Sequence, residues 1–299
     1  MRSNDQVRLN LSGYAKYREV LIDSAGTSIA LSLYMAGEGC PCIVFIPGTM
    51  THPLFYDDFL SLLAGSGYNV AGVHLLSHGK SPRQKKLFTF ADMLQNVRDT
   101  VTYCLDNVNK NVILMGSSQG GILSLAAAGM DNRIKAVFPH NVLLPSLSSS
   151  IQITRFPHYI KPFHKPLTSM IKLAARVAPG LQLPPSFYLD FDRVSRSKEL
   201  VDLFFCDPLN LKSYPLCFLV SLFTADLSKV SDGSIKCPVV IVASTGDTLF
   251  PYSYCLEVFE KIAAPHKEML VFDEPYHLIF NECTERVIGQ VVQKLNEFK

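Results

Sequence analysis

The pentapeptide Gly116-Ser117-Ser118-Gln119-Gly120 is the feature that most constrains this chain. It follows residues 111–115, an apolar run with the composition of a buried strand, and it continues into residues 121–128, which are predicted to form a helix. A sharp strand-to-helix turn brings the backbone close to itself, and glycines without a Cβ tolerate that approach. Ser118 is the middle residue of the turn and is therefore the candidate nucleophile, whereas Ser117 is not.

A serine hydroxyl needs a base to take its proton and a carboxylate to orient that base. The apolar run 238–244 is typical of a strand buried on both faces, and Asp247 follows it. Another strand is predicted over 267–272, with His277 in the loop behind it. The carboxyl ends of parallel strands meet at one edge of the sheet, where ligands bind. The sequence therefore predicts that Ser118, Asp247 and His277 meet there, in the order serine, carboxylate, histidine.

Other carboxylates and histidines are weaker candidates. Asp273 and Glu274 precede His277 on the same loop, so close along the chain that we do not prefer them as the orienting group. The other histidines either precede the nucleophile or lack an evident partner. They are His52, His74, His78, His140, His158, His164 and His266.

Two backbone N–H groups are candidates to bind the oxygen that becomes negative when a carbonyl is attacked. The first belongs to Gln119, directly after the nucleophile. The second is expected in the loop that follows the strand predicted over 42–46. Gly48 allows this loop to turn tightly, which favours the N–H of Thr49, with Met50 as the alternative.

Strand and helix patterns alternate through most of the chain, which predicts a mostly parallel sheet with helices on both faces. Eight strands are predicted to begin near Tyr17, Ser28, Cys42, Tyr68, Asn111, Ile134, Val239 and Lys267. Helices are predicted near 57–64, 90–107, 119–130, 252–263 and 283–297. The first two strands are expected to form an antiparallel hairpin at the edge of the sheet.

The alternation stops between residues 141 and 232, where no convincing buried strand is found and prolines and large apolar residues are frequent. We expect residues 142–232 to form a helical cap, or lid, inserted into a core made of 1–141 and 233–299. A cap over the serine would line the route to it, and an apolar route suits an acyl chain. The candidate substrate-binding residues are Met50, Phe187, Phe204 and Phe218.

Several segments resemble α/β-hydrolases of the monoacylglycerol lipase and lysophospholipase type. They are Leu76-Ser77-His78-Gly79-Lys80-Ser81, the turn around Ser118, Ser244-Thr245-Gly246-Asp247, His277-Leu278-Ile279-Phe280-Asn281-Glu282, and 173–209, which is similar to that family's cap. Two positions depart from the family. Pro47 stands where the family has the histidine of a His-Gly pair, and His74 lies where an aspartate often ends strand four.

The resemblance covers nearly the whole chain. It implies the α/β-hydrolase fold, with a mostly parallel eight-stranded sheet, helices on both faces and a helical cap inserted after strand six. It also implies a serine hydrolase that cleaves a small-molecule, lipid-like monoacyl ester through an acyl-enzyme, with no cofactor and no metal. Two alternatives stay open: the same three residues acting on a short-chain ester, a thioester or an N-terminal proline peptide, and a binding protein of this fold without turnover.

Composition narrows the class of protein. The formal net charge of +2 gives no signal for nucleic-acid binding. The polar start, Met1–Gln6, predicts no signal peptide, and no apolar run is long enough to predict a membrane span. The cysteines lie mostly within apolar segments, which is typical of reduced thiols in a cytoplasmic protein. Cys40-Pro41-Cys42 is the only close pair, so we expect no metal site there.

Residues 132–189 contain no Asp or Glu. The basic residues of this stretch are Arg133, Lys135, Arg155, Lys161, Lys165, Lys172 and Arg176. A helical apolar stripe runs through Leu167, Met170, Ile171, Ala174 and Val177, and Lys172 and Arg176 lie off it. This pattern predicts either a cap helix with a solvated basic face or a helix that makes a weak contact with an anionic membrane surface. The sequence does not predict an oligomeric state.

Overall fold

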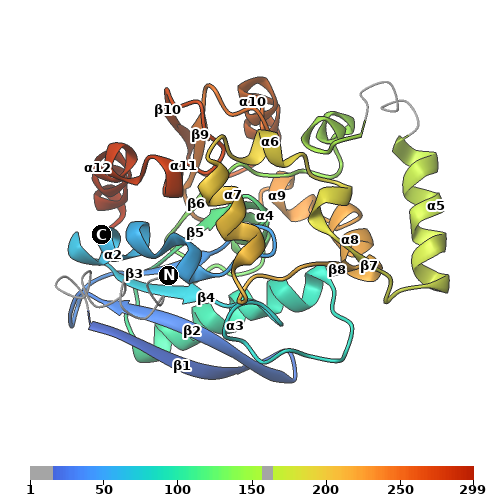
Figure 1. Cartoon of the computed structure of the whole chain (residues 1–299). Coiled ribbons are helices and arrows are strands. Elements are labelled where there is room, and N and C mark those ends of the chain that lie inside the picture. The colour runs from blue at the N-terminus through green and yellow to red at the C-terminus, as the bar shows by residue number, and fades with distance from the viewer. Residues whose placement is uncertain (1–15, 157–163) are drawn as a thin grey trace.

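The computed structural model describes residues 16–156 and 164–299, with the side chains of 164–168 outside that description. An eight-stranded sheet in the order β1-β2-β4-β3-β5-β6-β9-β10 forms its centre (Figure 1). The strands are β1 (Lys16–Ser24), β2 (Thr27–Met35), β3 (Cys42–Ile46), β4 (Asn69–Val73), β5 (Val112–Ser117), β6 (Ala136–His140), β9 (Val239–Ser244) and β10 (Lys267–Phe272). The predicted eight-stranded sheet is therefore confirmed.

The sheet is parallel from β4 through β3, β5, β6 and β9 to β10. Strand β2 pairs antiparallel with both β1 and β4, so it is the one strand of this sheet that runs opposite to the other seven. The predicted antiparallel hairpin at the edge is thus confirmed. Strands β3 to β6 and β9 are almost wholly buried, which explains why they have continuous apolar sequences instead of alternating ones.

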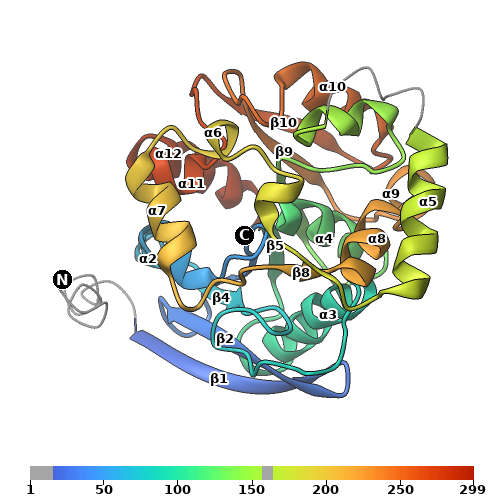
Figure 2. The same cartoon turned by 45° about the vertical axis from the view of Figure 1, so that its right-hand side comes forward.

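Helices cover the sheet on both faces, as predicted (Figures 1 and 2). The core elements are η1 (Pro53–Tyr56), α2 (Asp57–Gly65), α3 (Phe90–Asn107), α4 (Gln119–Ala128), α10 (Tyr252–Lys261), α11 (Ile279–Glu282), α12 (Thr284–Leu295) and η5 (Asn296–Phe298). Helix α3 packs against α4, and α2 packs against α12. A capping box between Thr89 and Asp92 fixes the start of α3. Across the described chain, no helix combines the length and apolar character that crossing a bilayer requires.

The chain between β6 and β9 forms an insertion of short elements. They are η2 (Ser148–Ile153), α5 (His164–Val177), β7 (Gln182–Leu183), η4 (Pro185–Phe187), α6 (Phe191–Val194), α7 (Lys198–Cys206), β8 (Tyr214–Pro215), α8 (Leu216–Phe223) and α9 (Ser228–Ser231). The sequence did not predict the two-residue ladder between β7 and β8, which is too short to leave a periodic pattern. Helix α5 lies at the right-hand edge of Figure 1 and packs against α8.

Steric contact explains the glycines of the turn between β5 and α4. A Cβ added to Gly116 would lie 2.0 Å from the carbonyl oxygen of Gly120. A Cβ added to Gly120 would lie 2.0 Å from the carbonyl oxygen of Ile46, at the end of β3. Ser118 between them has the positive φ of 53°, a conformation that costs free energy for a residue with a side chain. The turn therefore depends on glycine at both flanking positions.

Replacement of Gly116 by alanine should lower the free energy of unfolding by about 3 kcal/mol or more, because the contacting atoms belong to the backbone and cannot rotate away. The matched control is Gly289→Ala in α12, where an added Cβ meets nothing within 4 Å. That variant should gain about 1 kcal/mol from helix propensity. Urea unfolding of both variants measures the difference, and equal stabilities would contradict the steric account.

Candidate active site

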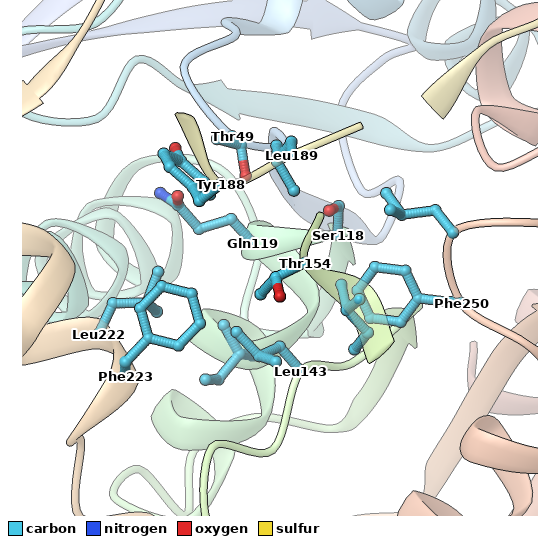
Figure 3. Close-up of a pocket in the computed structure, with 13 residues that line it drawn as sticks. Thr49, Ser118, Gln119, Leu143, Thr154, Tyr188, Leu189, Leu222, Phe223 and Phe250 are labelled. Carbon is cyan, nitrogen blue, oxygen red and sulfur yellow. The ribbon is translucent and has the colours of Figure 1, made fainter. Parts of the chain in front are cut away.

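Ser118 lies at the carboxyl end of β5, where α4 begins. Its backbone N–H donates to the carbonyl oxygen of His140 at 2.9 Å, which joins the turn to the end of β6. The half-buried Ser118 lines two small cavities. Figure 3 shows it in the wall of the first cavity, near Thr49 and Leu189. The serine is thus held at the edge of the sheet where the parallel strands end.

Asp247 and His277 meet at the same edge. The Nδ1 atom of His277 lies 2.9 Å from Oδ2 of Asp247, and both residues are buried. The other carboxylate oxygen of Asp247 accepts the backbone N–H groups of Leu249 at 2.7 Å and Phe250 at 2.9 Å. The Asp247 carboxylate accepts at both oxygens, so the proton in its bond to His277 lies on Nδ1 of the imidazole.

The Asp247 loop and the His277 loop are held together by the backbone. The N–H of Gly246 donates to the carbonyl oxygen of Glu274 at 3.1 Å, and a Cβ on Gly246 would lie 2.8 Å from Cα of Pro275. The ring of Phe250 stacks on the imidazole of His277, with centroids 5.2 Å apart. Glycine at position 246 therefore permits the close approach that sets the contact between the carboxylate and the imidazole.

Ser118 and His277 line the second cavity together. The hydrogen bonds of the described residues include none between Ser118 Oγ and His277. A nucleophile and its base are often separated in this way in structures without substrate and come together only when substrate is bound. The structure thus brings Ser118 and His277 to one cavity, with Asp247 bonded to His277 behind its wall. Of the two hydrogen bonds that the three predicted residues should form, the one between Asp247 and His277 is present.

The two weaker carboxylate candidates have other partners. Asp273 accepts the hydroxyl of Thr245 at 2.7 Å, and Glu274 pairs with the guanidinium of Arg286 through two bonds of 2.6 and 2.7 Å. Among these three carboxylates, only that of Asp247 is bonded to His277.

The N–H groups of the loop after β3 are not equivalent. The N–H of Gly48 donates to Oη of Tyr56 at 3.2 Å, and that of Met50 donates to Oη of Tyr214 at 2.9 Å. No hydrogen bond of the described residues engages the N–H of Thr49. Thr49 also lines both cavities next to Ser118. Of the two predicted donors in this loop, Thr49 therefore has the N–H that is free to bind a ligand.

Each of the two cavities beside Ser118 has a volume of about 40 Å³. The first is lined mainly by apolar side chains of the core and the insertion, including Ile122, Leu143, Ile153, Tyr188, Leu222, Phe223 and Phe250 (Figure 3). The second is lined by His277 and by aromatic side chains that include Phe55, Tyr56, Phe191 and Phe204. Ligand sites for small molecules are usually several times larger, so each cavity is too small for such a ligand in this structure.

The predicted substrate-binding residues are distributed unevenly around these cavities. Phe204 lines the second cavity. Phe187 is half-exposed and packs on Phe156, with ring centroids 6.0 Å apart, and Phe218 is fully buried against Tyr214. Neither Phe187, Phe218 nor Met50 belongs to the walls of the two cavities.

Asn141, which directly follows β6, is a site residue that the sequence analysis did not single out. Its Nδ2 lies 2.8 Å from Asp247 Oδ2, 2.7 Å from His140 Nε2 and 3.1 Å from His277 Nδ1. Since Nδ1 of His277 already carries a proton, the two amide hydrogens go to Asp247 and His140. His140 then carries its own proton on Nδ1, which faces Ser117 Oγ at 3.3 Å. Burial and the neighbouring His277 hold the pKa of His140 well below its usual value, so this imidazole is neutral.

Asn141 has a positive φ of 56°, which asparagine tolerates better than most residues. It directly follows the carboxyl end of the parallel strand β6, just as Asp247 and His277 lie a few residues beyond the ends of β9 and β10. The position itself was therefore a signal in the sequence that could have identified Asn141.

The other histidines have different partners. His52 Nε2 lies 2.9 Å from Asp207 Oδ2, His74 Nε2 lies 2.9 Å from Ser32 Oγ, and His78 Nε2 lies 2.8 Å from Tyr214 Oη. His266 lies 3.7 Å from Glu268 at the surface. His158 and the side chain of His164 lie outside the described part of the chain.

The described residues contain no group of three or more His, Cys, Asp or Glu side chains arranged to hold a metal ion. All eight cysteines are free thiols, and most are buried.

Comparison with known proteins gives the family. The profile of the family described as serine aminopeptidase, S33, matches residues 38–284. No curated protein matches the chain. The fold is similar to that of the Paleococcus ferrophilus monoacylglycerol lipase, with 21% identity, a TM-score of 0.69, and coverage of 95% of this chain and 100% of the other.

Two further solved structures have the same fold. A soluble variant of the Saccharomyces cerevisiae monoglyceride lipase, in complex with a substrate analogue, has 15% identity, a TM-score of 0.73 and coverage of 96% of each chain. A Pyrococcus furiosus esterase has 16% identity, a TM-score of 0.63, and coverage of 97% of this chain and 95% of the other. At identities this low, the structural similarity shows a shared fold and nothing more.

Replacement of Asn141 by glycine removes the amide but keeps a residue that accepts a positive φ. We expect the free energy of unfolding to fall by about 1–3 kcal/mol. Two buried acceptors, Nε2 of His140 and Oδ2 of Asp247, would each lose the hydrogen bond that the Asn141 amide donates. Urea unfolding measures the change. A variant as stable as the parent would show that the amide does not bond to these two groups.

Proposed function

Because this chain belongs to the serine aminopeptidase S33 family of α/β-hydrolases and is a serine hydrolase of the esterase type, we propose that it cleaves the carboxylic ester of a lipid-like monoacyl substrate. The proposed catalytic residues are Ser118, His277 and Asp247. The observation that carries this proposal is the buried hydrogen bond of 2.9 Å between His277 Nδ1 and Asp247 Oδ2, beside a cavity shared with Ser118.

In the proposed reaction, Ser118 Oγ attacks the ester carbonyl while Nε2 of His277 takes the hydroxyl proton. Asp247 keeps the Nδ1–H tautomer of His277 in place and stabilises the imidazolium that forms. The N–H groups of Thr49 and Gln119 bind the oxyanion. His277 then gives its proton to the leaving alcohol, and a water molecule hydrolyses the acyl-enzyme by the same route.

The linings of the two cavities support the proposed substrate class. The first cavity is apolar and suits the acyl chain, whereas the second contains His277, which must protonate the leaving alcohol. Because each has about 40 Å³, a long acyl chain can enter only if the walls move. Tyr188, Leu189 and Phe204 are wall residues that belong to the insertion. We therefore propose that residues 142–232 act as a cap whose displacement opens the site.

Two polar atoms are buried without a hydrogen-bond partner among the described residues: the hydroxyl of Tyr188, in the proposed cap, and Oε1 of Gln119, at the start of α4 in the core. Both residues line the first cavity. A buried polar atom without a partner costs free energy, and a hydroxyl of the substrate could remove that cost. This supports a substrate that carries polar atoms near its ester, such as a monoacylglycerol or a lysophospholipid.

A short-chain ester is the second candidate, because the small cavities would need the least movement to admit it. A series of p-nitrophenyl esters of increasing acyl length separates the two. Rates that rise toward long chains support the lipid-like substrate, and rates highest for acetate support the alternative. A thioester and an N-terminal prolyl amide, assayed in parallel, test the remaining bond types, and absence of all turnover would indicate a binding protein.

The alanine variant of Ser118 should lower kcat for these esters by about 10³-fold or more, because the nucleophile is lost while the binding surfaces stay. The control is Ser117→Ala, which removes the adjacent hydroxyl and should keep the greater part of the activity. If Ser117→Ala were as damaging as Ser118→Ala, the assignment of the nucleophile would be wrong.

The basic stretch of the cap is proposed to meet an anionic lipid surface. Helix α5 exposes apolar side chains to solvent, with Met170 62% and Val177 81% exposed. Of the stripe residues whose side chains the structure describes, only Ile171 is half-buried. Lys172 and Arg176 are exposed on the same helix. An exposed apolar face with flanking cations suits the interface of an anionic bilayer. Of the other residues of the stretch, Arg155 is bonded to the carbonyl oxygen of Ser186, and Lys161 and the side chains of Lys165 and Leu167 lie outside the described residues.

Turnover of a monoacyl lipid should be faster in anionic than in neutral vesicles, by a factor that falls as salt rises. Charge reversal of Lys172 and Arg176 to glutamate should remove this advantage but leave hydrolysis of a soluble ester unchanged. The matched control reverses Lys16 and Lys110, two exposed lysines of the core. If the control variant also lost the advantage, the effect would come from net charge alone. If the parent protein had equal rates on anionic and neutral vesicles, the basic face of α5 would be merely solvated and would not contact the membrane.

A further inference from the structure

Tyr214, the first residue of β8, connects the insertion to the residues around Ser118. Its side chain is fully buried and packs on Phe218, with ring centroids 4.3 Å apart. The hydroxyl oxygen has three partners from three separate segments of the core: the loop after β3, the start of α4 and the loop after β4. It lies 2.9 Å from the backbone nitrogen of Met50, 3.2 Å from Nε2 of Gln119 and 2.8 Å from Nε2 of His78.

The positions of the hydrogens in this cluster follow from its neighbours. Nδ1 of His78 lies 2.8 Å from the carbonyl oxygen of Leu76, which can only accept, so the proton of His78 is on Nδ1. Burial lowers the pKa of His78 to about 3, so the imidazole is neutral and its Nε2 is an acceptor. The hydroxyl of Tyr214 must therefore donate to His78. Its two lone pairs accept the N–H of Met50 and the amide N–H of Gln119, which uses the full capacity of the hydroxyl.

Each of the two donors bonded to Tyr214 adjoins a proposed oxyanion N–H. Met50 directly follows Thr49, and it has a positive φ of 61°. Its carbonyl oxygen also accepts the backbone N–H of Leu211 at 3.0 Å, so the insertion holds both polar groups of this residue. A positive φ in a residue with a side chain persists only when its surroundings hold it. Gln119 supplies the other oxyanion N–H from its own backbone and is bonded to Tyr214 through its side chain.

We propose that Tyr214 is a positioning residue that fixes the oxyanion hole, by holding the loop of Thr49 and the first residue of α4 through one hydroxyl. This inference rests on the proposed function. It also explains why Met50, the alternative donor in the loop, is not used: its N–H is taken by Tyr214. The role of the hydroxyl is to set the direction of the Thr49 N–H before substrate binds.

Other bonds make residues 207–214 a fixed support of the core. Asp207 is bonded to His52, which follows the loop of Thr49, at 2.9 Å. The carbonyl oxygen of Leu209 accepts the backbone N–H of Gly79 at 3.1 Å. A cap that opens must therefore move around this support, so that the oxyanion hole stays assembled while the rest of the insertion is displaced.

The phenylalanine variant of Tyr214 tests the proposal, because it removes the hydroxyl and keeps the ring. With a soluble ester we expect kcat to fall about tenfold or more and KM to stay within a factor of two. An alkyl boronic acid forms a tetrahedral adduct with a serine nucleophile and places an oxygen in the oxyanion hole. Its inhibition constant should rise by the same factor as kcat falls. An alkyl alcohol of equal length, which makes no adduct, should bind unchanged.

The control is Tyr68→Phe. Tyr68 is also fully buried, and its hydroxyl donates to Oδ1 of Asn296 at 2.9 Å, at the amino end of β4. This variant also loses a buried hydroxyl and should show the same kinetics as the parent. If Tyr214→Phe matches the parent in kcat and in boronic acid inhibition, the proposal is overturned. If the parent itself neither hydrolyses esters nor binds the boronic acid, the proposed function fails instead.

If Tyr214→Phe does not fold, a second variant tests the same proposal. Gln119→Met keeps the backbone N–H of residue 119 and removes only the amide that bonds to Tyr214. We expect a smaller change in the same direction, about threefold in both kcat and the inhibition constant of the boronic acid. An unchanged inhibition constant in the folded variant would contradict the proposed role of the hydroxyl.

Discussion

The close approach of three backbone segments at the turn around Ser118 is the constraint on which the rest of the site depends. A Cβ on Gly120 would collide with the carbonyl oxygen of Ile46. A Cβ on Gly116 would collide with the carbonyl oxygen of Gly120. Because the turn is pressed against the end of β3, the loop of Thr49 begins directly beside the serine. Neighbouring parallel strands then bring Asn141, Asp247 and His277 to the same edge.

Neutral imidazoles and one shared carboxylate organise the polar groups behind this edge. His140 and His78 are both buried, and burial lowers the pKa of each, so neither adds a charge to the site. Asp247 accepts bonds from two backbone N–H groups, from Asn141 and from His277. These four donors fix the orientation of the carboxylate, and the bond to Nδ1 of His277 leaves Nε2 as the ring atom that can accept a proton.

The sequence predicted those parts of the structure that regular strands control. The sheet, its edge hairpin and the contact between Asp247 and His277 followed from apolar runs and from the rule that parallel strands end at one edge. Asn141 follows the same rule, but the sequence did not predict its role, because a serine nucleophile calls for a base and a carboxylate and the side chain of Asn141 is a neutral amide. The catalytic roles of Ser118, Asp247 and His277 stay predictions, as do the cap boundaries at 142 and 232.

The insertion could not be predicted at the same level, because its contacts join residues far apart in the chain without a periodic pattern. Tyr214 reaches Met50 and Gln119 from a two-residue strand. The choice between Thr49 and Met50 as a donor depends on that contact and was open in the sequence. The exposure of the apolar stripe of α5 could not be predicted for a similar reason. Apolar spacing predicts a helix face, but it does not show which neighbouring element covers that face. In the structure α8 packs against α5 but leaves Met170 and Val177 exposed.

The central claim is that the edge of this sheet activates Ser118 and no other serine. Labelling with a fluorophosphonate, followed by mass mapping of the digested protein, tests it most directly. The account predicts one adduct per chain, located on Ser118, and much slower labelling when His277 is replaced by alanine. An adduct on Ser117, or no adduct on the folded protein, would contradict the account.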